Sequence, residues 1–224
     1  MPSVKMPRKS TDTDMTPFVD IAFLILSFFI MATKFKPQEP VETKIPNSVS
    51  SEELPENDAI MVLVDSTNRV FFSVLSEKDR TVSDQIVTKA AELRSIKLTP
   101  EEVQNFRKTP AVGVPFSRLA ALLDMGPEEQ NAGAGQPGIP VLDSTDNQLA
   151  TWIRASKEVY AELGRPLKYL VKGDGSSKYP TIDAIITAFK KNDQLKFNLV
   201  TSLEKAPTGS ALDQYNNRMP ATKE

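Results

Sequence analysis

The chain of 224 residues contains no histidine and no cysteine. It therefore has no Cys/His zinc site, no thiol nucleophile, no histidine general base and no disulfide. Lys and Arg number 27 against 29 Asp and Glu, so the chain has no excess of positive charge with which to hold a nucleic-acid backbone. From these absences we expect no enzyme, no catalytic residue, no metal, no cofactor and no nucleic-acid partner.

The overall composition is that of a soluble globular protein, with 40% hydrophobic and 25% charged residues, but one segment departs from it. Residues 17–32 read PFVDIAFLILSFFIMA, and only Pro17, Asp20 and Ser27 interrupt the apolar run. With its neighbours the segment reaches about 28 Å as a helix, enough to span a bilayer. We predict a transmembrane helix over 16–33 rather than a cleaved signal peptide, because an acid interrupts the run and no small-residue cleavage site follows it.

The acid inside this segment, Asp20, needs an explanation. On a helix, Thr16, Asp20 and Ser27 fall on one face, which makes a polar stripe on an otherwise apolar surface. A carboxylate at membrane depth costs about 2.5–3.5 kcal/mol on insertion scales and is usually functional. We interpret Asp20 as a proton-translocating residue with Thr16 and Ser27 beside its path. The alternative is that Asp20 lies near the interface and only caps the helix or reaches the headgroups.

The stretch Asp14-Met15-Thr16-Pro17-Phe18-Val19-Asp20 resembles the signature that opens the single transmembrane helix of the ExbD/TolR family of biopolymer-transport proteins. The resemblance implies a stator subunit of the inner membrane, with its amino terminus in the cytoplasm and its soluble domain in the periplasm. It also implies a homodimer inside a pentameric ring of polytopic ExbB-like subunits. Such a complex uses the proton-motive force to energise outer-membrane transport through a TonB-like protein. Asp20 would carry the protons, and Thr16 and Pro17 would shape the start of the helix.

We divide the chain by composition and by this resemblance. A short segment ending in an aliphatic residue and proline follows the helix in ExbD/TolR proteins and is implicated in coupling, and Ile45-Pro46 is its nearest equivalent here. The residues around it alternate weakly and favour either an edge strand or a plain spacer. The predicted parts are a cytoplasmic tail at 1–15, the helix at 16–33, an extended linker at 34–58, a periplasmic α/β domain at 59–201 and a disordered tail at 202–224.

For 59–201 the patterns predict a small two-layer α/β domain in the order β-β-α…β-α-β. Thr81-Val82-Ser83-Asp84 matches a capping box and predicts a helix that runs to about Leu98. The late unit GDGSSKYPTIDAIITAF is similar to a strand–helix unit of ExbD/TolR domains, and we interpret Asp174 as a turn residue.

A helical insertion at about 99–163 interrupts this domain. It includes an amphipathic helix with Leu149, Trp152, Ile153, Val159, Tyr160 and Leu163 on one side. Short ExbD and TolR chains lack most of this insertion, and the chain most resembles long ExbD proteins of the Bacteroidetes type.

Three functions remain open. The first is the ExbD-type stator. The second is a TolR-like subunit of a Tol-Pal envelope-integrity system, in which the soluble domain touches peptidoglycan. The third is a membrane-anchored binding domain without proton flow. The sequence does not decide between ExbD and TolR roles, between proton and sodium, or among cargoes and stoichiometries, and it gives no role for the insertion.

Overall fold

A computed structural model of the chain describes residues 15–32, 43–48, 54–55, 57–76, 79–126, 130 and 135–203. The chain divides into two compact units, Met1–Pro37 and Gln38–Glu224. The predicted cytoplasmic tail lies outside the described residues except for Met15, and so does most of the predicted linker. Residues 204–224 of the predicted tail lie outside them as well.

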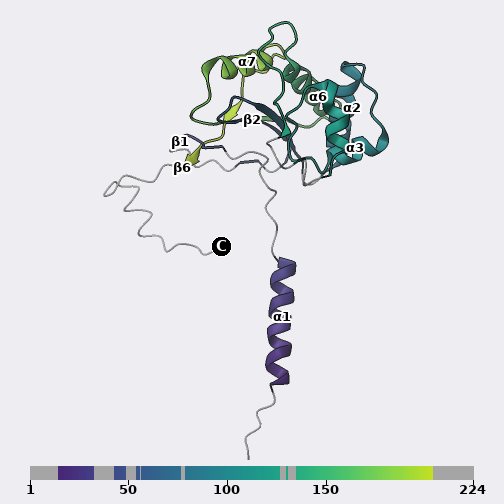
Figure 1. The fold of residues 1–224 in the computed structure, drawn as a ribbon, viewed down its shortest axis with the longest axis vertical. Helices are drawn as coiled ribbons and strands as arrows, with labels where there is room; N and C mark the ends of the chain where they lie inside the picture. Colours follow the sequence, from purple (N-terminus) through teal and green to yellow (C-terminus); the bar gives the residue numbers. More distant parts are fainter. Residues whose placement is uncertain are drawn as a thin grey trace, which may run out of the picture. The chain divides into compact units, whose positions relative to one another are not determined.

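The first unit contributes one helix, α1 (Thr16–Ala32; Figure 1). The backbone carbonyl of Met15 accepts hydrogen bonds from the amides of Phe18 and Val19 and so begins the helix. All its large apolar side chains are exposed within the chain, from 51% for Ile25 to 89% for Met31. Among the residues that the structure describes, no helix combines the length and the apolar character that crossing a membrane requires.

The second unit is built on a four-stranded mixed sheet. Its strand order is β3-β2-β4-β5, with β2 antiparallel to β3 and parallel to β4, and with β4 parallel to β5. The β2–β3 hairpin turns at Asn68, whose φ of 66° is in the left-handed region that Asn tolerates. The strands are β2 (Ala59–Val64), β3 (Val70–Leu75), β4 (Lys168–Gly173) and β5 (Asn198–Leu199).

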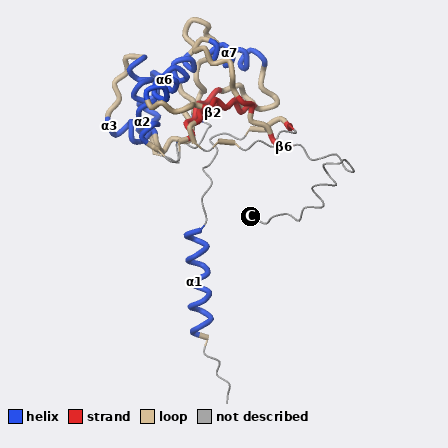
Figure 2. Tube along the Cα trace, turned by 180° about the vertical axis from the view of Figure 1, so that it is seen from behind, coloured by secondary structure: helices blue, strands red, loops and turns tan. Residues whose placement is uncertain are grey.

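Helices gather on one face of this sheet (Figures 1 and 2). Alternate residues of β2, namely Ile60, Val62 and Val64, join the helices in the main core, whereas Ala59 and Leu63 point into two smaller clusters. The small α/β domain with a mixed sheet is thus confirmed. The helices are α2 (Thr81–Leu93), α3 (Pro100–Phe106), η1 (Phe116–Arg118), α4 (Leu119–Asp124), α6 (Gln148–Glu162) and α7 (Tyr179–Lys190).

The predicted amphipathic helix of the insertion is α6, and it forms part of the core. Its Trp152, 1% exposed, stacks against three phenylalanines, with ring centroids 5.0 Å from Phe72, 5.9 Å from Phe106 and 5.0 Å from Phe116. Two of these rings, Phe106 and Phe116, also come from the insertion. The insertion is therefore packed into the domain through its aromatic side chains.

The capping box predicted at Thr81 is wrong. The Thr81 hydroxyl donates to Asp79 instead of accepting a backbone amide, and the helix begins after Arg80 without a side-chain cap. The reciprocal box occurs at α3, where Thr99 and Glu102 each accept the other's backbone amide. The helix predicted to reach Leu98 ends at Leu93.

The reason for this early end is a left-handed residue. Ser95 has a φ of 55°, and the amide of Ile96 bonds back to the carbonyl of Ala91 at 2.8 Å. Such a bond satisfies a carbonyl of the last turn and stops the helix.

A second, two-stranded sheet joins segments far apart in the sequence. Strand β1 (Asn47–Ser48) pairs in parallel with β6 (Ser202–Leu203). The first strand falls in the predicted linker, and the second falls at the start of the stretch for which we expected no order. At these four residues each strand supplies backbone hydrogen-bond partners that the other lacks.

Candidate functional site

The helix α1 carries three of the predicted site residues. At 100° per residue, Thr16, Asp20 and Ser27 fall within about 40° of one another around the helix axis. The Ser27 hydroxyl donates to the Leu24 carbonyl of its own helix at 2.9 Å. Within residues 15–32, the only part of the first unit that is described, the Asp20 carboxylate has no hydrogen-bond or ion-pair partner. The helix therefore presents an exposed acid that no other residue in 15–32 neutralises.

Pro17, the fourth predicted residue, is in the first turn of α1, where its missing amide has no carbonyl to bond. Ile45 and Pro46 lie in the second unit, directly before β1, with Ile45 half-buried and Pro46 exposed. The structure thus places Thr16, Pro17, Asp20 and Ser27 on one helix, and Ile45-Pro46 on the α/β domain.

The segment with Ile45-Pro46 is fastened to the domain through the backbone of Lys44. The Lys44 amide donates to Oδ2 of Asp174 at 2.7 Å, and the Lys44 carbonyl accepts the Gly175 amide at 3.0 Å. The first of these bonds joins residues 130 positions apart in the sequence. The residue that we interpreted only as a turn residue is therefore also the anchor of the segment that follows the helix.

Asp174 uses both carboxylate oxygens for this purpose. Its Oδ1 accepts the hydroxyl of Ser176 at 2.5 Å and the amide of Ser176 at 2.8 Å, while Oδ2 holds Lys44. Hydrogen bonds from the side chain and backbone of Ser176, and then from the Lys44 backbone, lower the pKa of the Asp174 carboxyl. A carboxylate held ionised by three donors is suited to anchoring rather than to general-base work.

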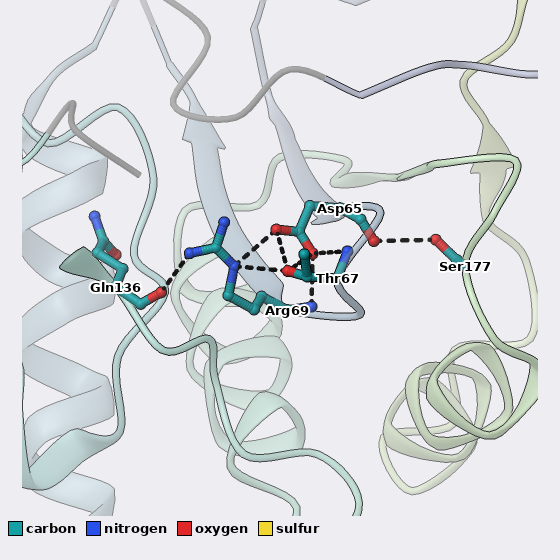
Figure 3. A network of polar contacts seen from close by, with 5 residues as sticks. All are labelled: Asp65, Thr67, Arg69, Gln136 and Ser177. Carbon is teal, nitrogen blue, oxygen red and sulfur yellow. Dashed lines mark hydrogen bonds and ion pairs between the residues drawn. The ribbon is translucent and has the colours of Figure 1, made fainter. Parts of the chain in front are cut away.

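Asp65 occupies the matching position at the end of the neighbouring parallel strand (Figure 3). It is 2% exposed and accepts bonds from the amides and side chains of Thr67 and Arg69. Burial raises the pKa of the Asp65 carboxyl, but hydrogen bonds from Arg69 and Thr67 outweigh it, so that the net shift is downward. The Ser177 hydroxyl donates to the Asp65 carbonyl at 3.4 Å and ties the two strand ends together.

An open cavity of about 540 Å³ lies at this end of the sheet. Ligands of α/β proteins commonly bind outside the carboxyl ends of parallel strands. The polar groups here are already bonded to one another through Asp174, and the part of the chain that the structure describes contains no cluster of acids able to hold a metal ion. The cavity is lined by Lys44, Ser66, Asp174, Gly175 and Ser176.

Sequence reasoning missed these anchors, although a local signal marks them. In four triplets an Asp accepts both the backbone amide and the hydroxyl of the Ser or Thr two residues later, with the hydroxyl 2.5–2.8 Å away. The pattern Asp-x-Ser/Thr predicts such a turn. It does not predict that Asp174 also holds Lys44. The triplets begin at Asp65, Asp79, Asp143 and Asp174.

Comparison with known proteins extends the resemblance over both units. A family model described as biopolymer transport protein ExbD/TolR matches residues 6–204. The chain belongs to the ExbD/TolR family. The match includes α1, the Lys44–Asp174 anchor and the α/β domain, and membership favours transport over catalysis. No curated protein and no solved structure matches the chain.

Proposed function

We propose that this ExbD/TolR protein is the proton-motive-force-transducing stator subunit of an ExbB–ExbD type motor in the inner membrane, and that it energises TonB-dependent transport across the outer membrane. The observation that carries the proposal is the pairing of a family match with one carboxylate, Asp20, that has no partner within the described residues 15–32, on a helix with exposed apolar sides. Intramembrane acids usually mark ion pathways.

The proposal assigns α1 and its flanking residues, 16–33, to the membrane. Apolar side chains that are exposed on all sides gain most from burial in lipid or against other apolar helices. Asp20 then needs hydrogen-bond partners from elsewhere, since its own unit offers none in the described residues. A ring of polytopic ExbB-like subunits around two copies of this chain would supply them, and Thr16 and Ser27 would line the same path.

Replacing Asp20 by Asn tests the proton step. Asn keeps the size and polarity of the side chain but neither takes up nor releases a proton. We expect Asp20→Asn to abolish growth on a scarce, receptor-imported nutrient while protein level and complex assembly stay near normal. Asp183→Asn, the same change at an exposed site of α7, is the matched control and should leave growth unchanged. Growth of the Asp20→Asn strain at the unmodified rate would refute the proton role.

The proposed topology has the amino terminus in the cytoplasm and the α/β domain in the periplasm. Because the chain has no cysteine, a thiol introduced at Ser3 or Ser144 is the only one present. In intact cells an impermeant thiol reagent should label Ser144→Cys, which is exposed on the domain, and spare Ser3→Cys. The opposite labelling pattern would overturn the topology.

We further propose a homodimer inside the polytopic ring, a state that native mass spectrometry can test. The sample is the full chain co-expressed with its genomic neighbour and purified in detergent. We expect a complex that contains two copies of this chain and several copies of a second polypeptide. A monomer, or an assembly without a second polypeptide, would contradict this arrangement.

The anchor at Asp174 supports a coupling role for Ile45-Pro46. The segment is held to the domain by Lys44, so that a movement of the linker acts on the end of strand β4. Asp174→Ala should release the segment and weaken energised growth. Asp143→Ala, which removes a similar Asp-x-Thr turn without a linker contact, is the control. If the two variants grew equally well, the Asp174 anchor would have no role in coupling.

The TolR-like role, with peptidoglycan as a ligand of the domain, is the second candidate. It shares the proton step at Asp20 and rests on the same family match. Deletion strains distinguish the two: loss of receptor-dependent uptake indicates the ExbD role, and detergent-sensitive, leaky envelopes indicate the TolR role. A membrane-anchored binding domain without proton flow is the third, and an active Asp20→Asn variant would favour it.

A further inference from the structure

The two edges of the four-stranded sheet present very different lengths of strand. Strand β5 at one edge has two residues, whereas β3 at the other has six, with the sequence VFFSVL. This stretch has no charge and no proline, and it is rich in β-branched and aromatic residues. An uncovered edge of this kind is a template for pairing with another chain, whereas a very short edge strand is a common natural protection.

A segment of the insertion, residues 110–114, covers the β3 edge. We call this segment the strap. The Phe72 amide donates to the Val112 carbonyl at 2.8 Å, and the Val112 amide donates to the Phe72 carbonyl at 2.7 Å, as in an antiparallel strand pair. The Ser73 hydroxyl donates to the Pro110 carbonyl at 2.6 Å. The strap thus occupies the amide and carbonyl of Phe72, in the middle of β3, that a further strand would use.

A second part of the insertion extends the cover toward the start of β3. The Ile139 amide donates to the Val70 carbonyl at 2.8 Å, and the Gly138 amide donates to the Gly113 carbonyl at 2.6 Å. The outward carbonyl of Val70 and the amide and carbonyl of Phe72 are therefore bonded within this one chain.

The strap is held closely at Gly113. A Cβ at this position would lie 2.2 Å from Cδ1 of Phe71, so that only glycine fits against the ring. The side-chain oxygen of Gln136 accepts a hydrogen bond from the Gly113 amide at 2.5 Å. The backbone carbonyl of Gln136 accepts a hydrogen bond from Nη1 of Arg69 at 3.0 Å (Figure 3). Gln136 is 4% exposed. These contacts connect the strap to the Asp65 network through Arg69.

We propose that the strap is an edge guard, which closes β3 and prevents it from pairing with β3 of a second copy of this chain. The occupant that it excludes is a second copy, because an antiparallel pair of two such uncharged, β-branched and aromatic edges would use the same Phe72 amide and carbonyl that Val112 now uses. The guard gives the insertion a role in preventing two domains from pairing through their β3 edges, whichever transport role the protein serves; it does not bear on a dimer formed through other surfaces.

A cross-linking experiment on the full, detergent-purified chain tests the guard. Ser73→Cys introduces the only thiol of the chain, on the covered edge. In this background Val112→Pro removes the amide that bonds Phe72, whereas the control Val112→Ala shortens the same side chain and keeps the amide. The measurements are maleimide labelling of the thiol and the yield of covalent dimer with a short bis-maleimide, which tolerates a shift of register.

We expect Val112→Pro to raise both labelling and dimer yield several-fold over Val112→Ala. An increase in labelling without an increase in dimer would overturn the proposal, because the edge would then be open and still not pair. Equal labelling of the two variants would overturn it as well, because the strap would not be what covers the edge.

If the circular dichroism spectrum shows that Val112→Pro does not fold, a second variant keeps the test decisive. Gln136→Ala removes the side chain that holds Gly113 and leaves every backbone amide in place. It should raise the same two readouts by a smaller factor, and its failure to do so while folded would overturn the guard. None of these readouts depends on Asp20 or on transport, so the guard and the proposed function fail independently.

Discussion

Helix α1 and the α/β domain differ in the burial of their large apolar side chains and in the hydrogen-bond partners of their acids. In the domain, the buried Asp65 is surrounded by donors and Trp152 is 1% exposed among phenylalanines. In α1 the large apolar side chains are exposed, and Asp20 has no partner within residues 15–32. The domain buries most of its apolar side chains in its own core, whereas α1 has the composition of an element that is completed by lipid and by other helices. This difference locates the proposed proton step in α1 and the structural work in the domain.

The largest effect should come from the aromatic core. Trp152→Ala removes a side chain packed against Phe72, Phe106 and Phe116, and a buried aromatic truncated to Ala costs about 3–5 kcal/mol of unfolding free energy. Urea unfolding followed by circular dichroism measures the change. Leu142→Ala, at a side chain that is 70% exposed, is the control and should shift stability little. A small effect of Trp152→Ala would show that the insertion is not part of the core.

Acid should destabilise the domain through four carboxylates acting together. Hydrogen bonds from the Ser or Thr two residues later contribute to lowering the pKa of Asp65, Asp79, Asp143 and Asp174 below 3.8. A carboxyl with a lowered folded-state pKa stabilises fully above the unfolded pKa, and this stabilisation is lost as the pH falls through the folded pKa. We expect unfolding free energy to decrease progressively below about pH 5.

Near-ultraviolet circular dichroism of the single tryptophan follows this transition in the domain alone, because α1 has no tryptophan. Stability that stays flat down to pH 2 would show that these turns are not formed in solution.

Alkali should act through two phenols. Burial raises the pKa of Tyr160 and of Tyr169 to about 12 from 10.0. A group with a raised folded-state pKa stabilises fully below its unfolded value, and the stabilisation is lost as the pH rises through the folded value. Unfolding free energy should therefore decrease between pH 10 and 12. This decrease involves two phenols, whereas the decrease in acid involves four carboxyls. Tyr169→Phe should weaken this decrease, and an unchanged alkaline limb would exclude Tyr169 as a contributor.

Removing one carboxylate from each region compares their contributions to the unfolding free energy. Asp65→Ala removes the buried carboxylate that accepts hydrogen bonds from Thr67 and Arg69, which should cost about 1–3 kcal/mol. Asp20→Ala, the same change in α1, should leave the unfolding of the domain unchanged. Urea titrations of both variants in detergent compare them directly. Equal losses would mean that the two units are energetically coupled.

The smallest effect is expected at Ser27. Its hydroxyl bonds only to the Leu24 carbonyl of its own helix, so Ser27→Ala should change stability by less than about 0.5 kcal/mol. If Ser27 lies beside the proposed proton path, energised growth should nevertheless slow, though less than in Asp20→Asn. A matched change of Ala22 to Ser on the same helix should not slow it.

Local patterns were enough to predict the elements but not their ends. The apolar spacing of Leu149, Trp152 and Ile153 predicts α6, because a helix buries one face at a fixed period. The capping box at Thr81 failed because the same hydroxyl had a nearer acceptor in Asp79. A residue's type shows which hydrogen bonds it is able to make, and its neighbours decide which one forms.

By itself the sequence determined the apolar helix with one acid, the alternation of the strands and the family signature at residues 14–20, since each depends on residues close together in the chain. Tertiary structure alone decided that Lys44 is held by Asp174, that β1 pairs with β6 and that the strap closes β3. These contacts join backbone groups that remain unpaired after the local elements have formed. Which of them meet depends on how the sheet and its helices pack, and that information is absent from any short stretch of residues.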